Sequence, residues 1–329
     1  MNKTQLKQFA TKARRDIEQA VRQKAYSFGI TKESITPLQE LEDGLIINGT
    51  VMGDRERKLY THLKNKIALD GYEAVMSEAA YTWFNRFVAL RYMEVNNFLP
   101  IGMRILSSEK EGKKEPDALT DVLHLTDELD LKKDHVYKLK EENQLNNLYQ
   151  YLLIQQSNKL GDILPNVFEP ISDAMALLLP DNLLNENSVI RDLVNMVDEE
   201  SWREVEIAGW LYQFYISEEK DEVFKNLKKN KKIGKKEIGP ATQLFTPRWI
   251  VEYMVDNSLG RLWLESHPDE EFRSSLNYYL DDAEQEEAVL KQLENLKDPH
   301  LDIEQVSFLD IILQRLIQFN VIPKEVSHF

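Results

Sequence analysis

The sequence predicts a mainly α-helical protein, and three observations lead to that prediction. Apolar residues recur at the spacing of one helix face over 3–28 and again over 71–97. The stretch 200–220 is apolar on nearly every side, which is typical of a buried helix. Near the C-terminal end, Thr246-Pro247 precedes another apolar stripe and is a strong signal for a helix start.

Composition limits the kind of protein this is. With 329 residues, 29% charged and 42% hydrophobic, the chain has a soluble globular profile and room for two domains. No apolar run approaches the roughly 18 residues of a membrane span, and the N-terminus does not resemble a signal peptide. The absence of cysteine excludes disulfides, zinc-thiolate sites and thiol nucleophiles. We therefore expect a cytoplasmic protein with no membrane contact.

The first quarter of the chain holds three predicted segments. The helix over 3–28 carries its apolar stripe from Leu6 to Ala25, and Gly29 follows in the usual C-terminal position. Pro37 and three glycines predict an irregular segment over 30–53. A charged helix is expected over 54–66.

The helix over 71–97 is predicted to be central to the fold because its apolar residues cover more than one face. Arg91 and Glu94 are spaced to pair across one helical turn. Arg86 is expected to reach another helix, and contact with a phosphate is the alternative.

The middle of the chain continues the helical pattern. A helix is expected over 145–159 with Leu148, Tyr151, Leu152 and Gln155 on its apolar side, and another over 188–197. The apolar run 174–179 is too short to span a membrane and is predicted to be core. The aromatic residues of 200–220 are expected in the core, with base stacking as the alternative.

A basic patch follows in this otherwise acidic chain, whose formal net charge is −15. Six lysines fall within nine positions, 228–236. They either solvate a linker or contact the phosphate backbone of a nucleic acid. The six are Lys228, Lys229, Lys231, Lys232, Lys235 and Lys236.

The segment 241–255 combines an extended stretch, a helix start and an apolar face. Thr246 is predicted to cap the helix by accepting the Trp249 N–H, with Pro247 as the first helical residue. Such a helix start collects free backbone N–H groups and suits an anionic ligand. An ordinary capped surface helix is the alternative.

Residues 243–251, Gln-Leu-Phe-Thr-Pro-Arg-Trp-Ile-Val, resemble motif X, which begins the catalytic domain of adenine-specific DNA methyltransferases. The runs 80–96 and 209–217 resemble the N-terminal helical region of the PglX family, the adenine-specific methyltransferases of BREX phage-defence systems. This resemblance implies S-adenosylmethionine as cofactor and double-stranded DNA as substrate. It implies that Phe245, Thr246, Pro247 and Arg248 line the cofactor pocket.

The residues after motif X depart from the family's pattern. An acidic helical insertion is expected over 265–297, and 305–310 reads as a short buried strand ending in Asp310. The family pattern then has a Gly-x-Gly loop and an Asn-Pro-Pro element that contacts the flipped adenine. Here no two glycines are one residue apart, and no Asn precedes a Pro. We therefore expect a truncated, catalytically inactive form. The six histidines have no ligand spacing, so no metal site is predicted.

The sequence thus predicts a large helical domain over 1–225, a basic linker over 226–240, and over 241–329 the start of a Rossmann-like α/β methyltransferase domain. Other BREX proteins are possible partners. The competing hypothesis is a non-enzymatic helical interaction module, or an inhibitor acting on BREX components, that uses the aromatic-rich helices 80–96 and 202–216. A degraded gene product without function is a third reading.

Overall fold

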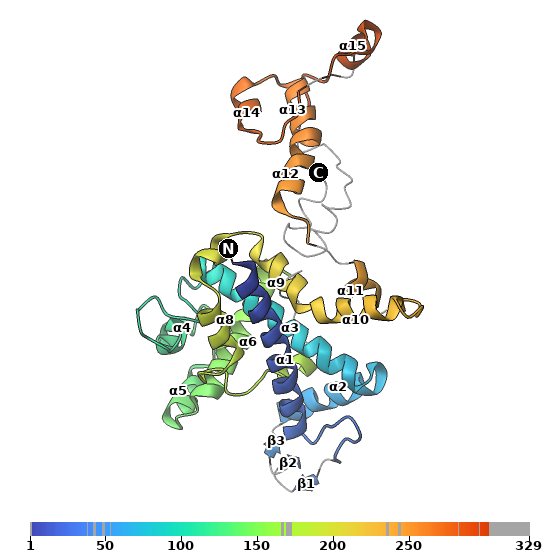
Figure 1. Ribbon diagram of the computed structural model, residues 1–329. Helices are drawn as coiled ribbons and strands as arrows, with labels where there is room; N and C mark the ends of the chain where they lie inside the picture. Colours follow the sequence, from blue (N-terminus) through green and yellow to red (C-terminus); the bar gives the residue numbers. More distant parts are fainter. Residues whose placement is uncertain are drawn as a thin grey trace. The chain divides into compact units, whose positions relative to one another are not determined.

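The computed structural model describes residues 2–302 apart from 38, 42–43, 48–49, 53, 166–167, 169–172, 235–236, 243–244, 282 and 296. Its contacts divide the chain into two units, Met1–Gln243 and Leu244–Phe329 (Figure 1). The described residues are mainly helical, as predicted. The strand predicted over 305–310 lies outside them, so the start of an α/β domain stays a prediction.

Helix α1, Lys3–Ser27, is the helix predicted from the first apolar stripe. The Asn2 side chain accepts the backbone N–H groups of Thr4 and Gln5 at 3.1 and 3.3 Å, which satisfies two donors at the helix start. Gly29, with φ of +66°, follows the helix. The stripe is buried against α3, α8 and α9.

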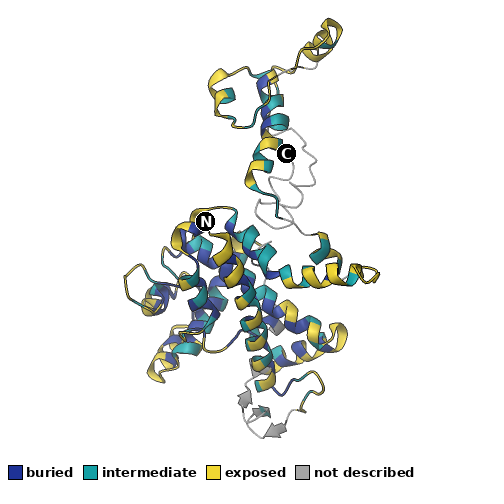
Figure 2. Ribbon diagram, in the orientation of Figure 1, coloured by how far each residue is buried: buried dark blue, intermediate teal, exposed yellow. Residues whose placement is uncertain are grey.

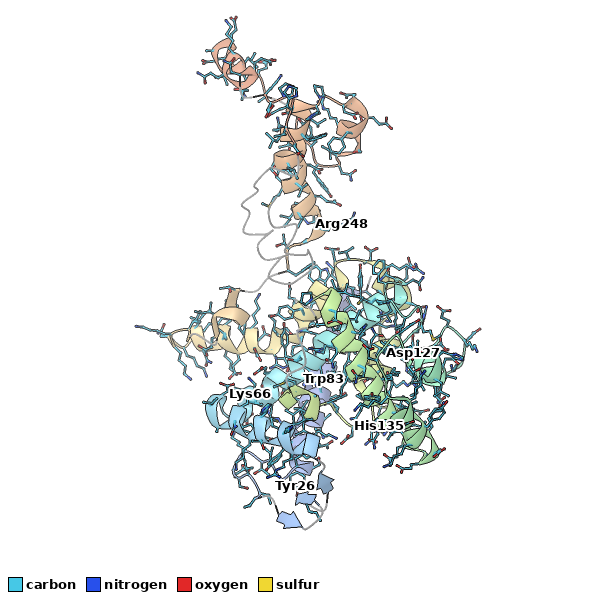
Figure 3. All side chains as sticks on the ribbon, turned by 180° about the vertical axis from the view of Figure 1, so that it is seen from behind. Tyr26, Lys66, Trp83, Asp127, His135 and Arg248 are labelled. Atoms are coloured by element: carbon cyan, nitrogen blue, oxygen red, sulfur yellow. The ribbon has the colours of Figure 1, made fainter. Side chains whose placement is uncertain are left out.

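Helix α3, Tyr72–Val95, is the central helix of the first unit, as its pattern predicted. Most of its length is buried, as the blue ribbon in Figure 2 shows. Trp83, labelled within this unit in Figure 3, is fully buried, and its indole N–H donates to the Met175 carbonyl at 3.0 Å. Since Met175 and Leu177 to Leu179 are buried too, the core prediction for 174–179 is confirmed at these positions.

The segment 30–53 is not simply irregular, and that prediction was wrong for part of it. It contains a three-stranded antiparallel sheet in the order β1-β2-β3, with Gln39 opposite Ile46 and Ile46 opposite Val51. Strands this short are too brief for alternation to be recognised in the sequence. The strands are β1 Gln39–Leu41, β2 Gly44–Ile47 and β3 Thr50–Met52.

The remaining helices complete the first unit. Helix α6 buries Tyr149, Leu153 and Gln156. The sequence predicted Tyr151 and Gln155 on the buried side instead, and neither is fully buried. The single helix expected over 200–220 is instead three helices, η2, α9 and α10. At the junction of α9 and α10, the Ser217 hydroxyl donates to the Phe214 carbonyl. The elements are α2 Asp54–Asp70, α4 Asp117–Thr120, η1 Val122–Leu125, α5 Lys133–Glu141, α6 Leu145–Ile163, α7 Asp173–Leu177, α8 Val189–Met196, η2 Glu199–Arg203, α9 Ile207–Tyr215, α10 Ser217–Leu227 and α11 Ile238–Thr242.

The second unit is a short helical array. Helix α12, Arg248–Val255, runs through a π-helical turn, Asp256–Gly260, into α13, Arg261–Ser266. Two further helices follow, α14 Glu270–Ser275 and α15 Glu287–Glu294. Within the described part of the chain, no helix combines the length and apolarity needed to cross a bilayer.

Candidate cofactor and nucleic-acid residues

Helix α12 begins one residue later than the sequence predicted. Pro247 is the N-cap, with the extended ψ of 144°, and its carbonyl accepts the Ile250 N–H at 3.0 Å. The described contacts of Thr246 include no hydrogen bond from the Trp249 N–H, so the predicted Thr246 cap was wrong. Because proline has no side-chain acceptor, this helix start keeps uncapped N–H donors.

The four predicted cofactor residues lie together at this helix start. Phe245, Thr246 and Pro247 are each half-buried, and Arg248 is exposed at the beginning of α12, where Figure 3 labels it. The Arg248 Nε donates to Glu252 Oε1 at 2.6 Å across one helical turn. An exposed pair of this kind contributes little free energy, so an anionic ligand can compete with Glu252 for Arg248.

The apolar residues of α12 are not buried by the described residues around them. Ile250, Val251 and Met254 are half-buried, whereas Trp249 and Tyr253 are exposed at 55% and 41%. The predicted apolar residues therefore do lie on a helix, but none of the eight residues of α12 is buried by the described residues.

A loop over 276–281 is fixed against the π-helical turn that follows α12. The Asn257 side chain donates to the Tyr278 carbonyl at 2.7 Å and accepts the Leu280 N–H at 2.8 Å. Asp256 accepts the Tyr278 N–H at 2.9 Å, and Arg261 donates to the Leu280 carbonyl at 2.6 Å. Sequence reasoning missed this loop contact because its partners lie about twenty residues apart and no local pattern links them.

Of the basic patch, the structure describes Lys228, Lys229, Lys231 and Lys232, all exposed, whereas Lys235 and Lys236 lie outside the described residues. These four lysines follow α10 in the first unit, so they fall in a different unit from Phe245 to Arg248. No ion pair joins any of the four to a described residue. Their charge is therefore not paired within the described part of the chain, which favours attraction of a polyanion.

Within the described residues of the first unit, Arg91 and Glu94 form a fully buried ion pair, as predicted from their spacing. Arg91 Nη1 lies 2.7 Å from Glu94 Oε1, and both side chains are almost completely buried. The other Glu94 oxygen accepts the backbone N–H groups of Ile105 and Leu106, each at 2.8 Å. The pair therefore fixes the chain after α3 in addition to bridging one turn.

Arg86 is buried among aromatic rings, which does not favour the alternative role of contacting a phosphate. Its guanidinium carbon lies 5.8 Å from the ring centres of both Trp83 and Phe168.

The aromatic residues of 200–220 are also largely in the core. Trp202 and Tyr215 are buried, and Trp210, Tyr212 and Phe214 pack against the core. Among the described residues, no three His, Asp or Glu side chains cluster as metal ligands.

Comparison with known proteins identifies the relatives of this chain. It is 38% identical over 317 residues to the adenine-specific methyltransferase BrxX of Escherichia coli O9:H4 (strain HS). It is 35% identical over 344 residues to the adenine-specific methyltransferase PglX of Lacticaseibacillus casei (strain Zhang). The chain is homologous to a segment of these methyltransferases. No protein-family model matches the sequence.

The two similarities cover 94% of this chain but only 26% and 28% of the relatives, so the chain spans about a quarter of their length. The resemblance to PglX stated from the sequence is thereby confirmed. Because the match extends over nearly the whole chain, it includes the helical unit as well as the motif X region. The activity of the complete relatives belongs to much longer chains.

Proposed function

We propose that this chain forms part of an S-adenosylmethionine-dependent, adenine-specific DNA methyltransferase of a BREX phage-defence system. The observation that supports this most is the similarity of 94% of the chain to two proteins named as adenine-specific methyltransferases. The motif X sequence at 243–251 adds the expected cofactor-contacting segment.

In this proposal, Phe245, Thr246 and Pro247 form one wall of the cofactor pocket. Their half-buried side chains leave surface for a ligand, and the uncapped N–H groups of α12 provide a positive helix end beside it. Arg248 exchanges its exposed bond to Glu252 for the cofactor's carboxylate. The incompletely covered apolar residues of α12 then pack against the rest of the methyltransferase.

The exposed lysines of the basic patch are proposed to contact the phosphate backbone of double-stranded DNA. Such contacts strengthen binding without selecting a sequence and weaken as salt is raised. The surrounding chain is acidic, so this local concentration of positive charge is where a polyanion is attracted. Other BREX proteins are proposed as further partners.

The 329 residues are proposed to lack methyl transfer on their own. Neither a Gly-x-Gly loop for the cofactor nor an Asn-Pro-Pro element for the flipped adenine occurs in the sequence. The incomplete cofactor pocket formed by residues 245–248 is therefore expected to bind S-adenosylmethionine weakly, in the millimolar range.

Calorimetric titration with S-adenosylmethionine tests this proposal. Weak binding that is lost in Phe245→Ala and Thr246→Val is expected, with Thr61→Val, an exposed threonine of α2, as the matched control. Binding weaker than millimolar, together with no retention of DNA at low salt, would instead favour the non-enzymatic interaction module. That alternative has lost support, because most aromatic residues it would use as contacts lie in the helical core.

A further inference from the structure

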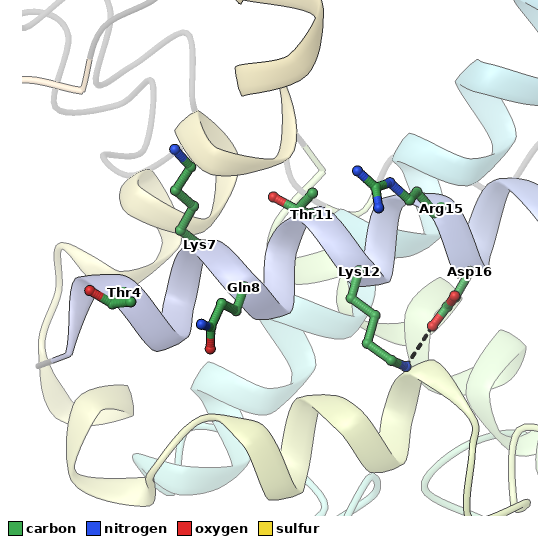
Figure 4. Close-up of a pocket in the computed structure, with 7 residues that line it drawn as sticks. All are labelled: Thr4, Lys7, Gln8, Thr11, Lys12, Arg15 and Asp16. Carbon is green, nitrogen blue, oxygen red and sulfur yellow. Dashed lines mark hydrogen bonds and ion pairs between the residues drawn. The ribbon is translucent and has the colours of Figure 1, made fainter.

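Two surface hollows of the first unit differ in what they offer a ligand. One runs along the polar face of α1 and is lined only by residues of that helix, including Lys7, Lys12 and Arg15 (Figure 4). There Lys12 pairs with Asp16 and Asp192, and Arg15 pairs with Glu218. This hollow is an ordinary solvated helix face.

The second is a cavity of about 860 Å³ between the loop over 104–114 and the start of α8. It is large enough for a ligand the size of a nucleotide. Five positively charged side chains line it: Arg104, Lys110, Lys113, Lys114 and Arg191. Four glutamates also line it, so its chemistry depends on which charges are already paired.

Most of the charged side chains around this cavity pair with one another. Arg104 is bound to Glu199, and Lys114 to Glu186. Lys113 lies 2.9 Å from Asp117. These pairs cancel most of the local charge.

Arg191 and Lys110 are the two of these five basic side chains that form no ion pair with a described residue, and Arg191 is the more buried. It is 8% exposed and lines the cavity. No described residue lies within hydrogen-bond or ion-pair distance of its guanidinium, although its backbone N–H donates to the Ser188 hydroxyl that caps α8. Its guanidinium nitrogens are not shut off from solvent, so an acceptor that enters the cavity can reach their donors. Its position beside the positive N-terminal end of α8 adds to the local positive potential.

One wall of the cavity is anchored by hydrogen bonds. The buried Glu94 carboxylate fixes Ile105, Leu106 and Ser107 in the loop that forms one wall. Arg91 extends this network toward the cavity, since its Nη2 lies 3.6 Å from Glu199. The loop wall of the cavity is thus held in place before a ligand arrives, which reduces the entropy lost on binding.

We propose that this cavity binds a phosphate group, with Arg191 as its buried anchor and Lys110 as a second contact at the rim. A tetrahedral oxoanion supplies the acceptors that Arg191 lacks, and a guanidinium donates to two phosphate oxygens at once. Lys110 is exposed and forms no ion pair with a described residue, so its charge is available to the same ligand. This inference does not depend on the proposed methyltransferase function.

Binding to the full 329-residue chain is measured by calorimetry with three probes: inorganic phosphate, adenosine monophosphate and a short duplex DNA. We expect Arg191→Met to weaken binding of at least one probe by about tenfold or more, since a hydrogen bond to a charged group is lost. Loss of mononucleotide binding identifies a free nucleotide as the source of the phosphate, and loss confined to the duplex identifies the DNA backbone. Either result supports the proposal.

Arg203→Gln is the matched control, because Arg203 is an exposed arginine that does not line the cavity. It should bind every probe as the wild type does. The unliganded Arg191→Met chain should melt near the wild-type temperature, because the substitution removes no hydrogen bond or ion pair of the guanidinium to a described residue. Should it fail to fold, Lys110→Gln provides a variant that changes only an exposed side chain and should still weaken binding. Equal affinities in wild type and both cavity variants, or no binding of any probe at millimolar concentration, would overturn the proposal.

Discussion

Replacing Glu94 by Gln is the sharpest test of how the first unit holds its loop over 104–107. The substitution keeps the size of the side chain and removes only its charge and one acceptor. One carboxylate oxygen of Glu94 accepts from Arg91 at 2.7 Å and from Ser107 at 3.0 Å, and the other accepts two backbone N–H groups at 2.8 Å. In either orientation of the amide, its NH₂ group therefore faces two donors.

The expected loss of stability follows from the burial of this network. Breaking one partner of a buried ion pair costs about 3–5 kcal/mol, because the remaining charge stays buried without compensation. Here that charge is Arg91, whose side chain is 3% exposed and keeps only the longer ion-pair contact of 3.6 Å to Glu199, so the lower end of this range is expected. A domain is typically stable by about 5–15 kcal/mol, so Glu94→Gln should remove a large fraction of the free energy of unfolding.

Chemical denaturation, followed by circular dichroism, measures this loss. The midpoint should move to a lower denaturant concentration, while the dependence of the unfolding free energy on denaturant stays unchanged. Glu200→Gln is the control, since Glu200 pairs with Arg203 at 3.3 Å on the exposed surface and should change stability by about 0.5 kcal/mol or less. A loss below about 1 kcal/mol in Glu94→Gln would show that the carboxylate does not hold the loop as described.

Three further predictions concern packing, pH and charge. Gly161→Ala places a Cβ atom 2.5 Å from the Phe168 carbonyl oxygen and should destabilise the chain by about 1–3 kcal/mol, whereas Gly239→Ala meets no atom within 4 Å and should not. Burial raises the pKa of Tyr81, Tyr149 and Tyr215 above the ordinary value of 10.0, so their folded forms keep protons that the unfolded chain releases. Stability should be constant with respect to these groups below pH 10 and fall as pH rises further, and a denaturation series across this range that shows no fall would contradict it. Replacing the four described lysines of the basic patch by Gln should lower the slope of log affinity for DNA against log salt by as much as about 0.9 for each lost phosphate contact, and an unchanged slope would place DNA contact elsewhere.

Local spacing predicted the elements that depend on neighbouring residues. The apolar stripe of α1 and the pairing of Arg91 with Glu94 follow directly from helical periodicity, and the structure contains both. Periodicity does not report which distant backbone a side chain reaches. The bonds from Ile105 and Leu106 to Glu94 were therefore invisible in the sequence, although they explain why this glutamate is buried.

The errors have local physical causes. Thr246 was assigned as the cap because threonine before proline is a common helix start, yet Pro247 has an extended ψ and the helix begins at Arg248. Strands of three and four residues left no alternation to recognise between 39 and 52. Arg191 was overlooked because it is followed directly by Asp192 in a short helix, and nothing in the local sequence distinguishes it from an ordinary surface charge. Its missing partner is visible only once the fold is known.

The proposed cofactor site is tested most directly by ultraviolet cross-linking of radiolabelled S-adenosylmethionine to the purified chain, followed by tryptic mapping. Cleavage after Lys236 and Arg248 places Phe245, Thr246 and Pro247 in one peptide, 237–248. At millimolar cofactor the proposal predicts label in this peptide, and loss of that label in Phe245→Ala. Label confined to other peptides, or an equal yield from the variant, would contradict the assignment of motif X as the cofactor wall.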